Sequence, residues 1–308
     1  MGESRGQIRL VSKSLIENVA AMTIFGTISL AVKNISVSTG EIAFWRVAIA
    51  VTAILLYKLI RREKLPFKEA KSDIIRLAIS GVLIGFDWIL FFEAFKYTTV
   101  SVTTLSYYFC PVLLMIASPL IFKEHITLKQ LLCFALATVG LVLIIGARSG
   151  GGEREFIGIA LALTAAVCYA VIIIINKRIK SVSGIDKTVF QFFAAIIVLG
   201  VYVPLTSGFH VSELPQSGFI WLAVLSLVHT AFAYCIYFSS ISNLSGQKVA
   251  LLAYIDPVIA VVVSIVFLHE SITFLQLIGG AMIIGVTILN ELGGAKKAAA
   301  KTMFERTQ

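Results

Sequence analysis

Residues 105–131 read LSYYFCPVLLMIASPLIFKEHITLKQL, and residues 251–277 read LLAYIDPVIAVVVSIVFLHESITFLQL. The second stretch is the first displaced by 146 residues, and ten of the 27 aligned positions are identical. Composition alone would make two apolar helices share Leu and Val, so the informative identities are the polar, aromatic and proline pairs. These pairs are Tyr108 with Tyr254, Pro111 with Pro257, Glu124 with Glu270, Thr127 with Thr273, and Gln130 with Gln276. The chain therefore contains an internal repeat.

The composition around this repeat is that of an integral membrane protein. Of the 308 residues, 58% are hydrophobic and 14% are charged, and the mean hydropathy is +0.94. A soluble domain carries roughly a quarter charged residues. A hydrocarbon core of roughly 30 Å needs about 20 apolar residues as helix, and in lipid the helix satisfies its own backbone hydrogen bonds. Hydropathy and polar breaks predict ten transmembrane helices over 14–35, 41–60, 74–96, 100–122, 127–146, 156–177, 187–206, 217–240, 247–268 and 273–292.

The repeat divides these helices into two halves, 14–146 and 156–292, followed by a cytoplasmic tail over 293–308. Because each half holds an odd number of spans, the second half starts from the opposite face of the membrane. The predicted fold is an all-α integral membrane protein of ten transmembrane helices, built as two inverted five-helix repeats. Secondary transporters use this architecture and bind their solute near the midplane, between the repeats.

The basic residues set the orientation. When residues at the span ends are counted with their loops, 21 of the 26 Lys and Arg lie on one side of the membrane. The other side holds only Lys96, Arg148 and Arg154. The positive-inside rule therefore predicts a multi-pass protein of the cell membrane with both termini in the cytoplasm. The net charge of +9 is then a topology signal and a complement to anionic lipid, and a nucleic-acid partner is not expected.

Several motifs resemble a known family. The stretch Glu93–Thr98, then Leu105–Pro111 and Lys123-Glu124, looks like the first-half pattern of the drug/metabolite transporter superfamily. Tyr254–Pro257 and His269-Glu270 resemble the matching second-half segment, and Lys33 and Arg46 also fit. The chain is most similar in pattern to the ten-span EamA-type transporters, although Phe25-Gly26 stands where many relatives carry Trp-Gly. The resemblance implies export or exchange of metabolites such as amino acids, amines or drugs, and the inverted repeat suggests that the two halves rock against one another to expose the site alternately.

Five ionisable residues stand out within the predicted spans: Arg46, Asp87, Glu93, His229 and Asp256. A charge in hydrocarbon costs about 3 kcal/mol even on lenient insertion scales, so such groups face a partner or water. Arg46 lies about 7 Å below the outer surface at 1.5 Å per residue, where it lines a polar cavity or snorkels. Asp87, His229 and Asp256 fall near the midplane and line the solute path or pair between helices.

Aromatic residues gather in the same helices. Trp45, Trp88, Phe91, Tyr108, Tyr234 and Tyr254 are candidates to contact the solute, and Trp88 corresponds to Tyr234 under the repeat. Their rings either stack on a flat or cationic solute or pack in the core. Pro111 and Pro257 are predicted to kink two helices at equivalent points, as mobile or static bends. Gly81-x-x-x-Gly85 predicts close helix packing.

The remaining motifs narrow the mechanism. The nucleotide-binding pattern G-x-x-x-x-G-K-[ST] is absent, and the sequence predicts no cofactor and no metal site. His269-Glu270 begins like the metal-binding motif H-E-x-x-H but lacks the second histidine. An intramembrane enzyme is therefore an alternative for which the sequence offers no nucleophile–base pair and no metal cluster. A solute channel is the second alternative. Without nucleotide the driving force is a gradient or a counter-solute. Asp256 is the predicted proton-coupling residue, because desolvation near the midplane favours the protonated form of a carboxyl group.

Overall fold

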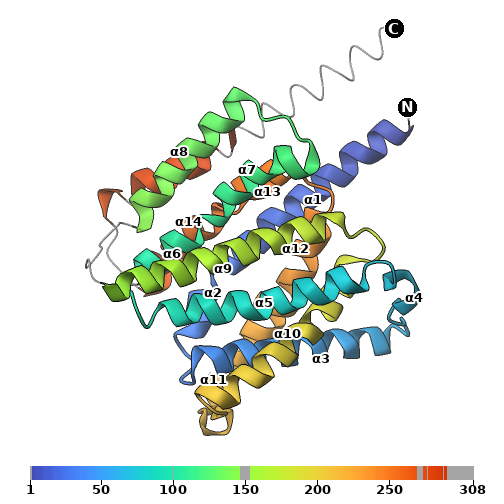
Figure 1. The fold of residues 1–308 in the computed structure, drawn as a ribbon, viewed down its shortest axis with the longest axis vertical. Coiled ribbons are helices and arrows are strands. Elements are labelled where there is room, and N and C mark those ends of the chain that lie inside the picture. Colours follow the sequence, from blue (N-terminus) through green and yellow to red (C-terminus); the bar gives the residue numbers. More distant parts are fainter. Residues whose placement is uncertain are drawn as a thin grey trace.

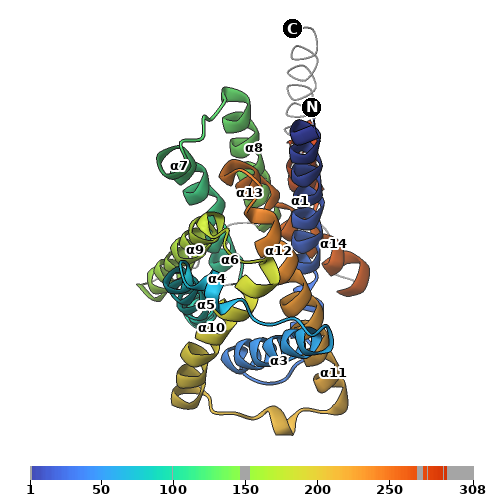
Figure 2. The ribbon, with the colours of Figure 1, turned by 90° about the vertical axis from the view of Figure 1, so that its right-hand side faces the viewer.

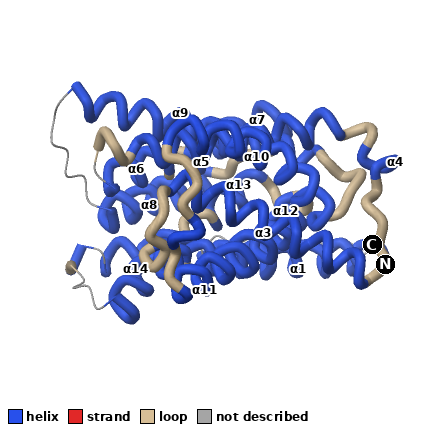
Figure 3. The backbone as a smooth tube through the Cα atoms, turned by 90° about the horizontal axis from the view of Figure 1, so that it is seen from below, coloured by secondary structure: helices blue, strands red, loops and turns tan. Residues whose placement is uncertain are grey.

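The structure is a computed structural model that describes residues 2–98, 100–145, 153–268, 273–275, 277–286 and 288–289. Over these residues the backbone is helical between loops and contains no strand (Figure 3). The elements are α1 Gly2–Gly26, α2 Ile28–Val32, α3 Thr39–Ile60, α4 Phe67–Ala70, α5 Ile74–Ala94, α6 Val100–Tyr107, α7 Cys110–Phe122, α8 Leu128–Ile145, α9 Glu153–Arg178, α10 Gly184–Thr206, the 3₁₀ turn η1 Val211–Glu213, α11 Gln216–Val224, the π-helix η2 Leu225–Phe232, α12 Ala233–Ile241, α13 Gly246–Leu252 and α14 Ile255–Leu268.

Among the described residues, six helices are long and apolar enough to cross a membrane. They are Leu10–Val32, Thr39–Ile60, Ile74–Ala94, Arg154–Arg178, Gly184–Thr206 and Gln216–Ile241. Each lies within a few residues of a predicted span. The other predicted spans contain shorter apolar helices, among them Cys110–Phe122, Leu128–Leu143 and Leu277–Val286.

Two of the predicted spans are each divided into two helices. Span 100–122 separates into α6 and α7, and span 247–268 separates into α13 and α14. Both divisions come just before the repeated proline, because Pro111 and Pro257 lie in the first turns of α7 and α14. Proline lacks the backbone N–H that would bond back to the preceding turn, and it is favoured at the start of a helix. Each proline therefore begins a new helix, where a bend in a continuous helix was expected.

Serine side chains set the starts of three helices. Ser38, Ser183 and Ser245 precede α3, α10 and α13, and each hydroxyl oxygen accepts a hydrogen bond of 3.2 Å from the backbone N–H three residues later. Such caps satisfy backbone donors that have no partner within the helix and stabilise the helix start by about 1 kcal/mol.

Helices α9, α5, α10 and α3 pack against one another in that succession (Figure 1). Gly81 and Gly85 allow the contact between α5 and α10, since a Cβ at Gly81 would lie 2.1 Å from the Gln191 carbonyl oxygen. The predicted small-residue contact is therefore present. Turned by 90°, the molecule shows α7 and α9 on one side, α1 and α14 on the other, and α12 and α13 between them (Figure 2).

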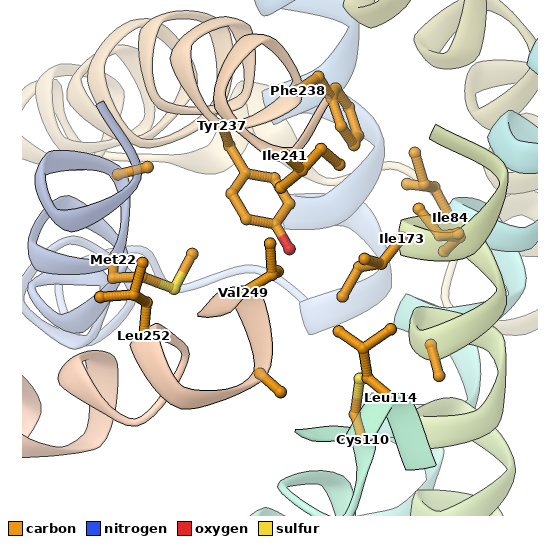
Figure 4. Close-up of a cluster of buried hydrophobic side chains, with 14 of the residues drawn as sticks. Met22, Ile84, Cys110, Leu114, Ile173, Tyr237, Phe238, Ile241, Val249 and Leu252 are labelled. Atoms are coloured by element: carbon orange, nitrogen blue, oxygen red, sulfur yellow. The ribbon is translucent and has the colours of Figure 1, made fainter. Parts of the chain in front are cut away.

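The main core lies where these helices converge. Met22 of α1, Ile84 of α5, Leu114 of α7, Ile173 of α9 and Tyr237 of α12 point toward a common interior (Figure 4). All five side chains are buried. Since both predicted halves contribute, the two halves share one core.

The long helix Gln216–Ile241 contains an eight-residue π-helical segment, η2. The side chains of this segment follow its wider spacing: the Thr230 hydroxyl donates to the Leu225 carbonyl, five residues back, at 2.8 Å. π-Helical turns are uncommon and often occur at functional sites. This segment packs against α3 and carries His229.

Candidate functional site

A cavity of about 300 Å³ lies at the meeting point of α1, α2, α3, α5, α6, α7, α9, α12 and α14. Among the described residues, 20 line this cavity, of which fifteen come from the first predicted half and five from the second. Both divided helices border it, through Tyr107 and Cys110 at one break and Ala253 and Asp256 at the other. The cavity is therefore placed where an opening of either break would change its shape.

Arg46 of α3 supplies a positive charge to the cavity. Its side chain is buried, with 6% of the residue exposed, and its Cζ lies 3.6 Å from the centroid of the Trp88 ring. The guanidinium interacts electrostatically with Asp87, Tyr107 and Tyr234, but its Nε has no hydrogen-bond partner. In the described part of the chain, no carboxylate oxygen lies within 4.0 Å of a guanidinium nitrogen of Arg46, the distance that defines an ion pair. Arg46 is thus stacked on an aromatic face but not neutralised by a contact ion pair.

Asp87 of α5 lies behind the cavity wall and does not line the cavity itself. It is 2% exposed, and its Oδ2 accepts a hydrogen bond of 3.3 Å from the Tyr107 hydroxyl. Its other oxygen, Oδ1, is buried without a hydrogen-bond partner. Asp87 therefore partly offsets the charge of Arg46 from a distance while it fixes the Tyr107 ring at the α6 end.

Asp256 lines the cavity in the first turn of α14. The Tyr108 side chain interacts electrostatically with its carboxylate, so groups from the two breaks lie near each other. Its backbone carbonyl faces Gly26 of α1, where an added Cβ would come within 2.6 Å of the carbonyl oxygen. The Asp256 carboxylate is hence held at a point where α1, α14 and the α6–α7 break meet.

Aromatic rings form much of the remaining wall. Eight of the lining residues are aromatic: Phe25, Trp88, Phe91, Phe92, Tyr107, Tyr108, Tyr169 and Tyr234. The rings of Tyr107 and Tyr169 are stacked with centroids 5.7 Å apart, and Trp88 meets Tyr234 edge to face at 6.0 Å. Edge-to-face and offset stacked rings attract one another, so these contacts stabilise the aromatic wall of the cavity.

The predicted site residues divide into two sets. Those that line the cavity are Arg46, Trp88, Phe91, Tyr108, Pro111, Tyr234 and Asp256. Those that do not line it are Trp45, Asp87, His229, Tyr254 and Pro257. The structure thus brings together most of the predicted residues and assigns the others to surrounding contacts.

Those surrounding contacts are specific. The Trp45 indole donates to Glu41 at 3.2 Å and packs on Phe209, near the start of α3. The Tyr254 hydroxyl lies 2.8 Å from Thr138 of α8. Neither ring lines the cavity: Trp45 bonds within its own helix, and Tyr254 bonds to a residue of another helix.

His229 joins two irregular points of the backbone. Its Nε2 lies 2.9 Å from the Thr27 hydroxyl oxygen, at the break between α1 and α2. The Thr27 hydroxyl is also 2.7 Å from the Ile24 carbonyl, to which it donates. Because that hydroxyl has one proton, it accepts from His229 Nε2 in the tautomer that carries the proton there, and Nδ1 lies 3.4 Å from the Val224 carbonyl oxygen. His229 therefore holds the α1–α2 break against the π-helical segment.

Tyr169 and Tyr107 are cavity residues that were not among the predicted contact residues. The Tyr169 hydroxyl donates to the Tyr237 hydroxyl at 2.9 Å, which orients its ring. Tyr107 adjoins the predicted Tyr108 and could have been found from its place beside the repeated proline. Tyr169 has no charged or repeated neighbour in the sequence, so no comparable signal pointed to it.

Polar groups away from the cavity have structural partners. Glu93 is bonded to Lys96 at 2.5 Å and to the Tyr202 hydroxyl. Glu124 accepts from the backbone N–H of Gly246 at 3.0 Å and from Lys177 at 3.1 Å. In the described part of the chain, no three His, Cys, Asp or Glu side chains form a group that would hold a metal ion.

Apolar spanning helices around a central cavity that contains charged side chains define a multi-pass membrane protein. The chain belongs to the EamA-like transporter family, whose model matches residues 14–146 and 156–291. That family and its members are transporters rather than enzymes.

Individual relatives agree with this assignment. The uncharacterized transporter YxxF of Bacillus subtilis is 24% identical over 96% of both chains, and an uncharacterized transporter of Archaeoglobus fulgidus is 25% identical over 88% of this chain and 93% of its own. A Salmonella typhimurium protein named probable amino-acid metabolite efflux pump is 25% identical over 59% of this chain and 64% of its own. A crystal structure of a protein aligns with a TM-score of 0.77 at 18% identity, covering 89% of this chain and 96% of that one; this likeness shows the fold alone.

Proposed function

We propose that the protein is a secondary transporter of small organic solutes, such as amino acids, amines or related metabolites and drugs. It works as an exporter or exchanger by alternating access. The observation that carries this proposal is the cavity bordered by both broken helices and lined by both halves of the chain. Discontinuous helices beside a central site are a recurrent feature of secondary transporters.

The proposed architecture is ten transmembrane helices in two inverted repeats, over 14–146 and 156–292, with a cytoplasmic tail over 293–308. Breaks at Tyr108-Phe109 and at Ala253-Tyr254 support it, because they fall at almost equivalent points of the 146-residue repeat. In this proposal the protein lies in the cell membrane with both termini in the cytoplasm, as the positive-inside rule predicts.

Within this proposal Arg46, Trp88, Phe91, Tyr108 and Tyr234 contact the solute. Asp87 acts through Tyr107, and His229 acts through Thr27, so both position the cavity wall without touching the solute. Trp45 and Tyr254 are left out of the contact set because neither lines the cavity: Trp45 bonds to Glu41 of its own helix and Tyr254 to Thr138 of α8. The efflux pump named among the relatives supports export as the direction.

Asp256 is the proposed coupling residue. It lines the cavity at the start of a divided helix, so a change in its charge acts on the solute and on the break together. Its repeat equivalent is the uncharged Cys110, which makes the carboxylate specific to one half.

The test is flux in proteoliposomes. Wild-type protein is expected to show saturable countertransport, which a channel does not show, and to leave the solute chemically unchanged, unlike an enzyme. Asp256→Asn mimics the protonated carboxyl group, so exchange at saturating solute should persist while net flux driven by a pH gradient is lost. Glu93→Gln, at a carboxylate outside the cavity, is the matched control and should leave both fluxes unchanged. If Asp256→Asn retains pH-driven flux, Asp256 is not the coupling residue.

A further inference from the structure

One end of the helix bundle carries a concentration of positive charge that lies apart from the cavity. It is built on two segments: residues 61–76, which join α3 to α5 through the short helix α4 (Figure 1), and residues 178–180 at the end of α9. These segments expose two carboxylates, Glu63 and Glu69, against eight basic side chains. The eight, called the basic face below, are Arg61, Arg62, Lys64, Lys68, Lys71, Arg76, Arg178 and Lys180.

We infer that the basic face binds the headgroup of an anionic phospholipid, such as phosphatidylglycerol, from the membrane leaflet on its side. None of the eight residues lines the cavity, so the ligand is a component of the membrane and not the solute. The inference therefore stands or falls independently of the proposed transport function.

Packing brings the two segments of the basic face together. Ala70 of α4 and Ile179, which lies between two of the basic residues, are both 0% exposed and belong to one buried cluster with Phe190 of α10. The ring of Phe67 meets the ring of Phe190 edge to face at 5.3 Å. Helix α4 therefore lies against the ends of α9 and α10, and the basic side chains of both segments share one surface.

A buried carboxylate fixes the edge of this surface. Asp73 is 5% exposed, and its two oxygens accept from Arg76 at 2.5 Å and from the Ser181 hydroxyl at 2.7 Å. Because Ser181 directly follows Lys180, these bonds place Arg76 and Lys180 around the same carboxylate. The spacing of the two cations is thus set by the folded structure and not by the flexibility of a loop.

Most of this charge is not compensated by the protein. Lys180 also repels Lys177 and Lys187, which lie near it. A bound anion between such groups relieves the repulsion of like charges in the folded state. Among the described residues, no carboxylate lies within the 4.0 Å of an ion pair with six members of the basic face: Arg62, Lys64, Lys68, Lys71, Arg178 and Lys180.

Apolar side chains beside the charges favour a lipid over a soluble anion. Ile60 at the end of α3 is 80% exposed, Phe67 of α4 is 63% exposed, and Ile75 in the first turn of α5 is 72% exposed. An inorganic anion offers nothing to cover these groups, whereas a phospholipid has a negative headgroup and acyl chains in one molecule. Basic and aromatic side chains at the ends of spanning helices match the headgroup region of a bilayer.

Competitive lipid retention tests the site. The full-length protein in detergent is incubated with equal amounts of phosphatidylglycerol and phosphatidylcholine of identical acyl chains, and the lipid that stays bound is quantified by native mass spectrometry. We expect phosphatidylglycerol to be retained over phosphatidylcholine by about tenfold or more, because several basic side chains act on one headgroup. The preference should fall as salt is raised, since the charges are exposed.

Two triple variants separate a local site from net charge. The first neutralises the lysines around α4: Lys64→Gln/Lys68→Gln/Lys71→Gln. It should lower the preference by about fivefold or more, with an unchanged unfolding midpoint in phosphatidylcholine alone, because these side chains are exposed and have no ion pair. The control removes the same charge from the C-terminal tail, outside the described residues, and should keep the preference: Lys296→Gln/Lys297→Gln/Lys301→Gln.

The double variant Arg178→Gln/Lys180→Gln tests whether both segments form one site, and it should also lower the preference. The inference is overturned if phosphatidylcholine is retained as well as phosphatidylglycerol, if the tail control loses as much preference as the α4 variant, or if the double variant has no effect. Inorganic phosphate is the last arm: should it raise the unfolding midpoint as much as phosphatidylglycerol does, the basic face binds a free anion and the lipid assignment is wrong.

Discussion

Gly26 shows how one residue controls the approach of two helices at the cavity. A Cβ added there would lie 2.6 Å from both the Asp256 carbonyl oxygen and the Ile259 Cβ, inside van der Waals contact. Gly26 also lines the cavity directly before the α1–α2 break. The missing side chain lets α1 touch α14 where the Asp256 carboxylate is positioned.

We predict that Gly26→Ala lowers the free energy of unfolding by about 1–3 kcal/mol, since the new methyl group must push α1 away from α14. Gly285 is the matched control, because nothing lies within 4 Å of a Cβ placed there. Gly285→Ala is expected to leave stability unchanged or to raise it by up to about 1 kcal/mol. Thermal or denaturant unfolding in detergent measures both, and equal effects of the two variants would contradict the close contact.

At the scale of elements, the two divided helices are the features most closely tied to the cavity. Pro111→Ala restores a backbone N–H that can bond to the carbonyl one turn back and so extend α6 into α7. We expect solute exchange to fall by about tenfold or more while the protein stays folded, because the break that shapes the cavity closes. Pro257→Ala should act in the same direction at the α13–α14 break.

Pro204 is the control for both substitutions, since it lies inside α10 and away from the cavity. Pro204→Ala is expected to leave exchange unchanged. Full exchange in Pro111→Ala and Pro257→Ala would show that the breaks are static packing features without a part in transport.

The start of α13 depends on a residue from the other half of the chain. Both carboxylate oxygens of Glu124 accept from the Gly246 backbone N–H at 3.0 Å, and Lys177 of α9 donates to Glu124 at 3.1 Å. One side chain therefore connects the end of α7, the end of α9 and the start of α13.

Glu124→Ala removes these acceptors and leaves the Lys177 side chain, which is 8% exposed, without its carboxylate, so we predict a loss of about 1–3 kcal/mol in the free energy of unfolding. Glu63→Ala is the control, because Glu63 is 45% exposed in its ion pair with Lys58 and such pairs contribute less than about 1 kcal/mol. A loss at Glu124 no larger than that at Glu63, by the same unfolding measurement, would contradict this role.

For the whole molecule, the orientation in the membrane is the property that the charge distribution predicts. Single cysteines at Gly151 and Ser212 fall in loops expected outside the cell, and one at Glu69 falls in a loop expected inside; Gly151 lies outside the described residues. An impermeant thiol reagent applied to intact cells should label the first two and reach the third only after permeabilisation. The parent protein, with Cys110 and Cys133 buried, gives the background. The reverse pattern would invert the proposed topology.

The sequence by itself determined the class of protein, the repeat and much of the cavity. Apolar runs of about 20 residues must be helices in lipid, whatever their neighbours, so length and hydropathy placed the long helices such as 74–96 close to α5. Arg46 and Asp256 could be chosen for the cavity because a charge in hydrocarbon must face a polar interior.

The tertiary structure decided which face of each helix is turned inward. Lipid tails are as apolar as a protein core, so hydropathy does not separate a core-facing ring from a lipid-facing one. For this reason Tyr169 could not be assigned to the cavity from sequence, and Trp45 could not be assigned away from it. The π-helical segment that directs His229 to Thr27 likewise depends on contacts with α3, because no local sequence pattern specifies that extra residue in the turn.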